Sequence, residues 1–175
     1  MTTRRGYLSL LDFGAGVGQV GRALLSKDAQ IRYRAYDGAG NVEKFTRGFV
    51  SFADLTLPIS LPRADWVLML EVGEHVPSAL EQVLVRNVHA HNCIGAIISW
   101  AALKQEGAHH INCHSEKYVR RIFIGLGYYV DSNVTSWLRD GVQGTAPGPL
   151  LPYLRHTLLA LRRWTPLTGN SCTVL

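Results

Sequence analysis

Cysteine is scarce in this chain of 175 residues: there are three, Cys93, Cys113 and Cys172, and no spacing pairs them. The spacing therefore predicts neither a disulfide framework nor a structural zinc site, and a reducing compartment is the default expectation. No run reaches the roughly 18 apolar residues needed to cross a bilayer, so no transmembrane segment is predicted. No secretory signal is found either, because Met1–Gly6 leads directly into the first predicted strand.

The sequence leaves the compartment of the protein open in some respects. A cytoplasmic protein is the default expectation. The C-terminal residues Cys172–Leu175 fit a loose prenylation box, although Thr173 is not aliphatic. Asn133 opens an Asn-Val-Thr glycosylation sequon, which matters only if the chain is secreted. The abrupt start predicts either a domain without an N-terminal helix or a chain that lacks an upstream segment, and the second case would allow secretion.

Charge is neither abundant nor strongly one-sided. Charged residues make up 18% and apolar residues 47% of the chain, as in ordinary soluble globular proteins. A net charge of +5 mostly serves solubility in such proteins. Two basic pairs, at 120–121 and 162–163, are expected on solvated faces, so nucleic acid is a less favoured partner than a small molecule.

Segments suited to strands alternate with segments suited to helices along the chain. Residues 139–152 are rich in Gly and Pro and predict a loop. The first helix is expected to bury Val20, Ala23 and Leu24. The alternation is typical of an α/β fold with a doubly wound parallel sheet, which binds ligands beyond the carboxyl ends of its strands. Strands are predicted at 7–12, 31–36, 48–52, 65–71, 94–100 and 127–130, and helices at 19–27, 41–46, 78–91 and 116–126. The pattern at 157–164 allows a final strand or a short helix.

The stretch after the first predicted strand carries two overlapping nucleotide-binding patterns. In one register, Gly16, Gly18 and Gly21 match the dinucleotide fingerprint, with Asp37 at the expected distance of about 20 residues. In the other, an acid at the strand end, Asp12, is followed by alternate glycines, Gly14, Gly16 and Gly18. A glycine-rich turn lets the backbone approach a ligand closely in both cases. The short chain leaves too little length for the second, catalytic domain of a dehydrogenase.

The second register resembles the class I S-adenosylmethionine-dependent methyltransferases. This resemblance implies a Rossmann-like fold with a seven-stranded, mostly parallel sheet in one domain, residues 1–164, followed by a flexible C-terminal tail, residues 165–175. Helices that usually precede the first strand in this class have no counterpart in the sequence. The chain looks most like the methyltransferase-like protein 24 group in the segments Asp12–Gly18, Tyr36–Asn41, Phe52–Thr56, Ala64–Pro77, Asn87–Asn92 and His110–Ser115.

The resemblance implies a set of residues around S-adenosylmethionine. This cofactor carries a sulfonium and an ammonium but no pyrophosphate, so carboxylates at the sheet edge suit it. Asp37 with Gly38 would hold the ribose hydroxyls, and Asp54 with Leu55 would lie beside the adenine. Asp37-Gly38 is also a turn signal, and Asp12 could merely cap a turn, so structural roles stay open. The remaining cofactor residues expected are Asp12, Gly14, Gly16, Gly18 and Glu71.

An acid–histidine cluster, Glu71, Glu74 and His75, follows the most apolar predicted strand. With His110 or His114 it could bind a divalent cation such as Mg²⁺ or Mn²⁺. Its Glu-x-x-Glu-His arrangement resembles that of small-RNA 3′-end methyltransferases and of some quinone-biosynthesis O-methyltransferases. Alternatively, Glu74 or His75 acts as a general base without metal. A third hypothesis is structural: the glutamates cap a helix or contact the cofactor indirectly, and His75 packs in the loop.

These observations lead to one main hypothesis about function and two alternatives. The main hypothesis is methyl transfer from S-adenosylmethionine to an oxygen or nitrogen nucleophile of a small or medium acceptor, with Glu71, Glu74, His75 and His114 facing that acceptor. One alternative is a small NAD-binding oxidoreductase or sensor. The other is a non-catalytic module that keeps the fold and serves a partner.

Overall fold

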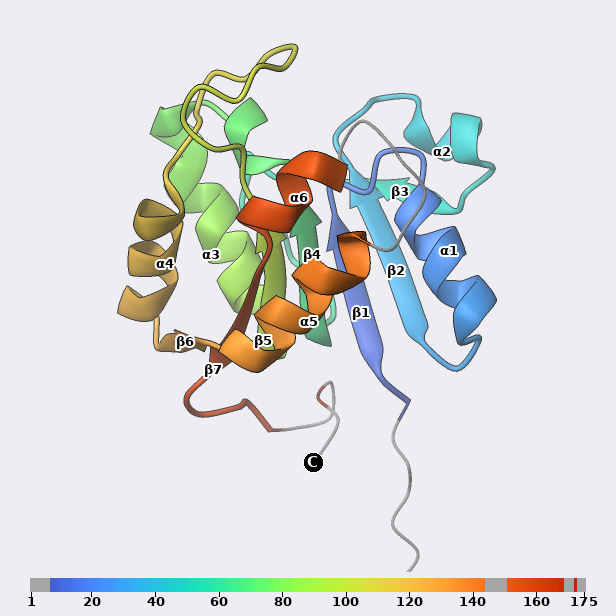
Figure 1. Cartoon of the computed structure of the whole chain (residues 1–175). Helices are drawn as coiled ribbons and strands as arrows, with labels where there is room; N and C mark the ends of the chain where they lie inside the picture. Colours follow the sequence, from blue (N-terminus) through green and yellow to red (C-terminus); the bar gives the residue numbers. More distant parts are fainter. Residues whose placement is uncertain (1–6, 144–150, 169–171, 173–175) are drawn as a thin grey trace, which may run out of the picture.

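The computed structural model describes residues 7–143, 151–168 and 172, which form one sheet with flanking helices (Figure 1). Its strands are β1 (Ser9–Phe13), β2 (Arg32–Asp37), β3 (Val50–Phe52), β4 (Ala64–Leu70), β5 (Asn92–Ser99), β6 (Tyr128–Val130) and β7 (Leu159–Arg163). The helices are α1 (Gln19–Lys27), α2 (Val42–Thr46), α3 (Glu81–His91), α4 (Glu116–Gly125), α5 (Ser132–Gln143) and α6 (Leu151–Thr157), with two 3-10 turns, η1 (Gly73–His75) and η2 (Ser78–Leu80).

The strands form one seven-stranded sheet in the order β3-β2-β1-β4-β5-β7-β6. β1 pairs in parallel with β2 and β4, and β4 pairs in parallel with β5, whereas β7 runs antiparallel between β5 and β6. The predicted fold class, a doubly wound and mostly parallel seven-stranded sheet, is confirmed. The strand order reverses between β1 and β4, which is the place where open α/β sheets bind ligands.

Helices cover both faces of this sheet, which explains why its central strands are apolar throughout. Right-handed crossovers place α1, which follows β1, and α3, which follows β4, on opposite faces. Figure 1 shows α3 and α4 on one side and α5 and α6 on the other. Among the described helices, none combines the length and the apolar character that a membrane span requires.

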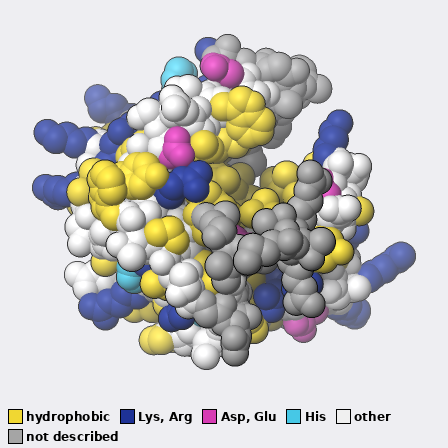
Figure 2. Space-filling model, turned by 90° about the horizontal axis from the view of Figure 1, so that it is seen from below, with side chains coloured by type: hydrophobic (Ala, Val, Ile, Leu, Met, Phe, Trp, Pro, Cys, Tyr) yellow, Lys and Arg dark blue, Asp and Glu magenta, His cyan; other side chains and the backbone are white. Residues whose placement is uncertain are grey.

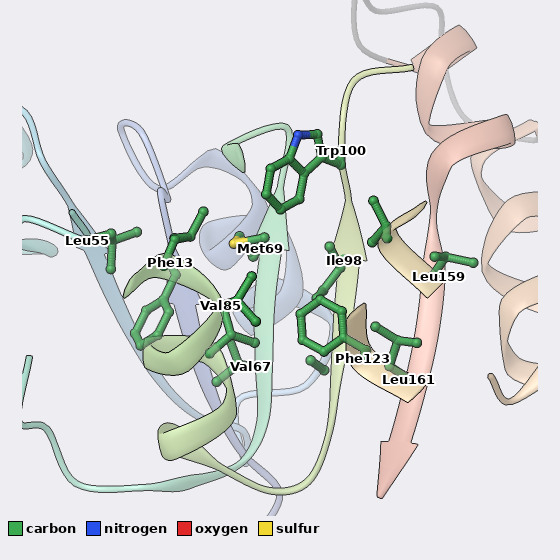
Figure 3. Close-up of a cluster of buried hydrophobic side chains, with 14 of the residues drawn as sticks. Phe13, Leu55, Val67, Met69, Val85, Ile98, Trp100, Phe123, Leu159 and Leu161 are labelled. Atoms are coloured by element: carbon green, nitrogen blue, oxygen red, sulfur yellow. The ribbon is translucent and has the colours of Figure 1, made fainter. Parts of the chain in front are cut away.

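The main hydrophobic core lies between the sheet and the layer of α3 and α4 (Figure 3). Strands alternate the faces to which successive side chains belong, so every second residue contributes. Val85 of α3 and Phe123 of α4 pack against these strand residues, and Trp100 follows the end of β5. The strands contribute Phe13 from β1, Val67 and Met69 from β4, Ile98 from β5 and Leu159 and Leu161 from β7.

The buried face of α1 differs from the predicted one. Val20 and Ala23 are exposed and Leu24 is half-buried, whereas Gly21 is the buried residue of this helix. A Cβ atom at Gly21 would lie 2.1 Å from the ring of Tyr33 in β2. The prediction of the buried face was wrong because α1 does not pack through an apolar stripe. It packs through Gly21, which has no side chain and so lets the helix approach β2 closely.

Two helices occupy much of the stretch predicted as a loop at 139–152. α5 continues through Gly141, α6 begins at residue 151, and residues 144–150 lie outside the described part of the chain. The hydroxyl of Thr135 accepts the N–H of Ala160, which fastens α5 to β7. The glycine and proline content misled the prediction, because one glycine costs a helix only about 1 kcal/mol and Pro152 stands in the first turn of α6, where proline is tolerated.

The expectation that no cysteines pair is wrong. Cys93, at the start of β5, forms a disulfide with Cys172 across 79 residues of sequence. The N–H of Leu167 donates to the carbonyl oxygen of Cys93 at 2.9 Å, so this part of the predicted tail is attached to the sheet. Sequence spacing carries no information about so distant a pair. The disulfide also uses the sulfur that prenylation of Cys172 would require, while Cys113 is a free cysteine.

A methyl group at Gly95 is predicted to destabilise the centre of the sheet. A Cβ atom there would lie 2.2 Å from the carbonyl oxygen of Leu161 and 2.7 Å from the ring of Trp66, and paired backbone cannot move aside easily. We expect Gly95→Ala to lower the free energy of unfolding in urea by about 1–3 kcal/mol. The control is Gly141→Ala, where nothing lies within 4 Å and a gain of up to about 1 kcal/mol is expected. Wild-type stability of Gly95→Ala would contradict this packing.

Candidate cofactor-binding site

A pocket of about 310 Å³ opens beyond the carboxyl ends of β1, β2 and β4, where the strand order reverses. Its volume lies in the range of small-molecule sites. The lining combines separate strand ends and includes six of the nine residues predicted at the cofactor: Gly14, Asp37, Gly38, Asp54, Leu55 and Glu71. The other lining residues are Thr56, Val72, His75 and Val76, whereas Asp12, Gly16 and Gly18 are not part of this lining. A larger hollow of about 570 Å³ beside α2 contains none of the predicted site residues.

The turn after β1 depends on glycine. The φ angles of Gly14, Gly16 and Gly18 are 76°, 56° and 79°, in the left-handed region that other residues disfavour. At Gly14 space is also missing, since a Cβ atom would lie 2.3 Å from Cγ2 of Val72. The N–H groups of Gly14 and Ala15 donate to the carbonyl oxygen of Tyr36, at 2.8 and 3.0 Å. The turn is therefore held between the ends of β2 and β4, with bare backbone at the pocket.

Asp37 holds this glycine turn from the end of β2. Its Oδ2 accepts the N–H of Gly16 at 2.8 Å, and its Oδ1 accepts the N–H of Ala39 at 2.9 Å. Each carboxylate oxygen has a further lone pair, which a ribose hydroxyl could occupy. Asp54, which follows β3, accepts the hydroxyl and the N–H of Thr56, and these hydrogen bonds lower the pKa of Asp54. Two carboxylates thus stand on the β2–β3 side of the pocket.

Asp12 does not line the pocket. It is 3% exposed, and the hydroxyl of Tyr33 donates to its Oδ2. Burial raises the pKa of Asp12 to about 6, although the hydrogen bond from Tyr33 opposes the shift, and the charge of Asp37 adds to it. The structure therefore places Asp12 in contact with β2 and outside the lining of the pocket.

Glu71 connects three parts of the chain at the end of β4. Its φ is 53°, a conformation rare for residues other than glycine and frequent at functional sites. Its N–H donates to Oγ of Ser99 at 2.9 Å. Its carboxylate accepts Nε2 of Gln105 at 2.6 Å and the hydroxyl of Thr157 at 3.4 Å. Glu71 therefore joins the loop after β5 and helix α6 to the rim of the pocket.

Glu74, His75 and His110 form a cluster beside Glu71. One potential ligand atom from each lies within 4.8 Å of the others. Glu74 is fully buried, and neither of its carboxylate oxygens has a hydrogen-bond partner among the described residues. Burial, reinforced by the charge of Glu71, raises the pKa of Glu74 to about 7. A buried carboxylate without hydrogen bonds is costly, so Glu74 either carries a proton or pairs with a cation.

The two histidines of this cluster differ in exposure. His75 is exposed and lines the pocket, and its ring packs edge-on to that of His110 at 5.0 Å between centroids. Partial burial and the neighbouring His110 lower the pKa of His75, which favours a neutral ring that can accept a proton. His110 is half-buried, and its Nε2 lies 4.0 Å from Oε1 of Glu74.

His114, which the sequence placed with this cluster, lies in a different network. Its Nε2 is 2.6 Å from Oε2 of Glu81, the first residue of α3. Although burial opposes the shift, hydrogen bonds from Tyr118, Asn112 and His114 lower the pKa of Glu81. The structure therefore brings His110, and not His114, to Glu74 and His75.

Several residues of the site gave no signal in the sequence. Gln105 belongs to no motif, and Thr157 is 86 residues away from the Glu71 carboxylate that it contacts. Glu81 resembles an ordinary acidic residue in the first turn of a helix, a position that carboxylates favour for electrostatic reasons. Its burial, at 7% exposed, becomes apparent only when α4 and the loop after β5 are in place.

The two basic pairs, which were predicted on solvated faces, differ in exposure. Arg163, expected on a solvated face, is 8% exposed and donates to Oδ1 of Asn92 at 2.9 Å. Arg120 pairs with Glu116, as a surface residue would. On the face of the molecule that Figure 2 shows, Lys and Arg side chains stand around the outline with apolar side chains between them, and they form no single basic patch among the described residues.

Comparisons with known proteins bear on the fold. No protein-family model matches the chain, and no curated protein matches its sequence. Magnesium protoporphyrin IX methyltransferase (ChlM) from Synechocystis PCC 6803, with bound S-adenosylmethionine, is similar in structure, with a TM-score of 0.62 and 18% identity over 89% of this chain and 70% of that chain. A putative methyltransferase from Haloferax volcanii, in complex with the Trm112 activator, has a TM-score of 0.60 and 16% identity. The match covers 91% of this chain and 83% of that chain.

A third similar structure is named for a different reaction. The [4+2]-cyclase SpnF has a TM-score of 0.60 and 15% identity, over 94% of this chain and 77% of that chain. At these identities the likeness establishes the fold, and a shared fold does not determine the reaction. The chain has the Rossmann-like fold of class I S-adenosylmethionine-dependent methyltransferases.

The burial of the Asp12 carboxylate predicts how the stability of the protein depends on pH. Its pKa is about 6 in the folded state against an ordinary value of 3.8, so between these values the folded state binds more protons than the unfolded state. The free energy of unfolding therefore falls as the pH rises through this window. The asparagine of Asp12→Asn cannot ionise. Between pH 4 and pH 8, the free energy of unfolding of this variant, measured in urea, should therefore rise by about 2–3 kcal/mol relative to that of the wild type.

Tyr33→Phe provides the matched comparison for Asp12. It removes the hydrogen bond that holds the pKa of Asp12 down, so the total loss of stability with rising pH should become larger than in the wild type and should extend to higher pH. A constant difference between Asp12→Asn and wild type across this range would show that Asp12 does not titrate as described.

Proposed function

We propose that this chain transfers the methyl group of S-adenosylmethionine to an oxygen or nitrogen nucleophile on a small or medium acceptor. The observation that carries the proposal is the pocket at the switch point, where the glycine turn meets Asp37, Asp54 and Glu71. S-adenosylmethionine, when bound, would supply a methyl group attached to a sulfonium sulfur, which is a good source of methyl because it leaves as a neutral thioether. The fold shared with ChlM, which is named as a methyltransferase, supports the same reaction class.

The cofactor would lie along the lining of the pocket. The backbone at Gly14 and Gly16 admits its amino-acid portion, because no side chain intervenes. Asp37 with Gly38 receives the ribose hydroxyls, and Asp54 with Leu55 stands at the adenine. Asp12 takes no part in this contact.

Two residues at the other side of the pocket face the acceptor. His75 lines the pocket, and its lowered pKa keeps the ring available as a proton acceptor near neutral pH. Glu71, held by Gln105 and Thr157, fixes the loop after β5 and α6 around the acceptor. These residues orient the nucleophile and remove its proton. Orientation alone contributes much of the acceleration in a displacement of this kind.

Metal assistance is a second form of the same proposal, and the unpartnered carboxylate of Glu74 favours it. Glu74, His75 and His110 provide one oxygen and two nitrogen ligands, a donor set suited to Mn²⁺ or Zn²⁺ more than to Mg²⁺. Such an ion would neutralise Glu74 and lower the pKa of an acceptor hydroxyl. Glu71 and His114, the other ligands expected from the sequence, are bound by Gln105 and by Glu81.

The alternatives have less support. A dinucleotide site would use Gly21 with Gly16 and Gly18, and Gly21 does serve close packing of α1 on β2, as a third fingerprint glycine would. The antiparallel β7 between β5 and β6, however, departs from the six-strand order of dinucleotide-binding folds. A scaffold without catalysis would not require two buried or strained glutamates, Glu71 and Glu74, at the rim of a pocket.

Titration calorimetry tests the cofactor. S-adenosylmethionine should bind to the wild type, NAD should not, and Asp37→Ala should weaken binding at least about tenfold, since a hydrogen-bonded charged group contributes about 1.5–3 kcal/mol. The control is Asp28→Ala: Asp28 also accepts a backbone N–H in a turn, from Gln30, but lies outside the pocket. Binding of NAD alone, or equal affinity of the Asp37→Ala variant, would contradict the proposal.

Titration with Mn²⁺ tests the metal-assisted form. The wild type should bind one ion, and Glu74→Gln and His110→Asn should abolish binding while S-adenosylmethionine still binds. His114→Asn is the matched control, because His114 is hydrogen-bonded to Glu81 and should leave Mn²⁺ affinity unchanged. No binding of Mn²⁺ or Zn²⁺ by the wild type would exclude the metal-assisted form and leave the metal-free base, His75.

A further inference from the structure

The disulfide is part of the folded core. Cys93 is fully buried and Cys172 is 9% exposed, and they pack with Ile94, Trp66 and Leu167. Disulfides form and persist in oxidising compartments and are rare in the cytosol. The disulfide therefore favours an oxidising compartment over the reducing one that the sequence suggested. In the secretory pathway, unlike the cytosol, the Asn133 sequon can be glycosylated.

The asparagine of that sequon is accessible in the folded chain. Asn133 is exposed in the first turn of α5. Other residues hold this turn: the N–H of Val134 donates to Oδ1 of Asp131 at 3.1 Å, and the buried hydroxyl of Thr135 accepts the N–H of Ala160 at 3.0 Å. The turn is therefore built without the Asn133 side chain, whose amide nitrogen is available to carry a group.

A large apolar side chain lies one helical turn further on. Trp137 is 70% exposed, and it stands four residues after Asn133, so the two side chains share a face of α5 at neighbouring positions. The apolar face of a sugar ring packs well on an aromatic ring, and a sugar attached to Asn133 would begin within reach of Trp137.

We propose that Asn133 carries an N-linked glycan acquired in the secretory pathway, and that the innermost N-acetylglucosamine packs on Trp137. The donor is an oligosaccharide linked to a lipid pyrophosphate. A bond forms between the amide nitrogen of Asn133 and C1 of the sugar, the bond from C1 to the pyrophosphate oxygen breaks, and the amide nitrogen loses one proton. Transfer takes place on the extended chain, so the later burial of Thr135 does not prevent it.

The glycan and the proposed methyl transfer are independent of each other. Among the described residues, none of those in α5 lines the pocket at the switch point, so a sugar on Asn133 leaves the pocket open. Loss of the glycan should therefore leave S-adenosylmethionine affinity unchanged, and failure of one proposal does not imply failure of the other.

The glycan is tested with the full chain, directed by an appended signal peptide into the endoplasmic reticulum of cultured animal cells. Peptide-N-glycosidase F should increase the gel mobility of the wild type and of Thr135→Ser, which keeps both sequon and hydroxyl, but not of Asn133→Gln. Non-reducing peptide mapping should find Cys93 linked to Cys172. A disulfide-bonded wild type with unmodified Asn133, or a native protein that carries free Cys93 and Cys172 thiols, would overturn the proposal.

A double-mutant cycle tests the contact with Trp137. Asn133→Gln should lower the Tm of the secreted protein by about 2–4 °C in the wild-type background, as expected for about 1 kcal/mol in a domain of this size. In the Trp137→Ala background the same substitution should have no effect, because the sugar has lost its partner. Equal shifts in both backgrounds would show that the glycan does not pack on Trp137.

Discussion

The carbonyl oxygen of Tyr36 accepts two N–H groups from the turn after β1, and the neighbouring Asp37 carboxylate accepts a third. These bonds press the turn against the end of β2, while Val72 after β4 approaches it from the other side. Only a backbone without a side chain at Gly14 fits between them. The pocket exists because three strand ends converge on this turn, and each residue proposed to contact the cofactor takes its position from that convergence.

Two buried carboxylates, Asp12 and Glu74, show how differently the fold treats charge around the same sheet edge. Asp12 has a protein partner, the hydroxyl of Tyr33. Glu74 lies in η1 and has no hydrogen-bond partner for its side chain in the described part of the chain. Local stability is commonly given up where function requires it. The proposed metal-assisted reaction depends on the carboxylate without a partner, that of Glu74.

The two edges of the sheet differ in what they carry: the carboxyl ends of the strands carry the pocket, and the start of β5 carries the disulfide. At the carboxyl ends, Glu71 connects Gln105 and Thr157 to the rim of the pocket through hydrogen bonds. Near the start of β5, the Cys93–Cys172 disulfide and the backbone bond from Leu167 fasten the C-terminal segment. The constraint therefore acts on the strand that continues into the loop carrying His110. Because the same fold occurs in methyltransferases and in a cyclase, the rim and not the sheet has to determine the chemistry.

The sequence by itself determined the features that depend on neighbouring residues. Alternate glycines predicted the turn after the first strand, and apolar runs predicted the strands of the doubly wound sheet. Residues at the carboxyl ends of parallel strands share one edge of the sheet, so most of the pocket lining could also be predicted.

Tertiary structure alone decided which side chains pair. It directed His114 to Glu81 and His110 to Glu74, joined Cys93 to Cys172 and buried Asp12 under Tyr33. The physical reason is range: backbone preferences act over a few residues, whereas these partners stand 21 to 79 residues apart and meet only when helices and loops pack.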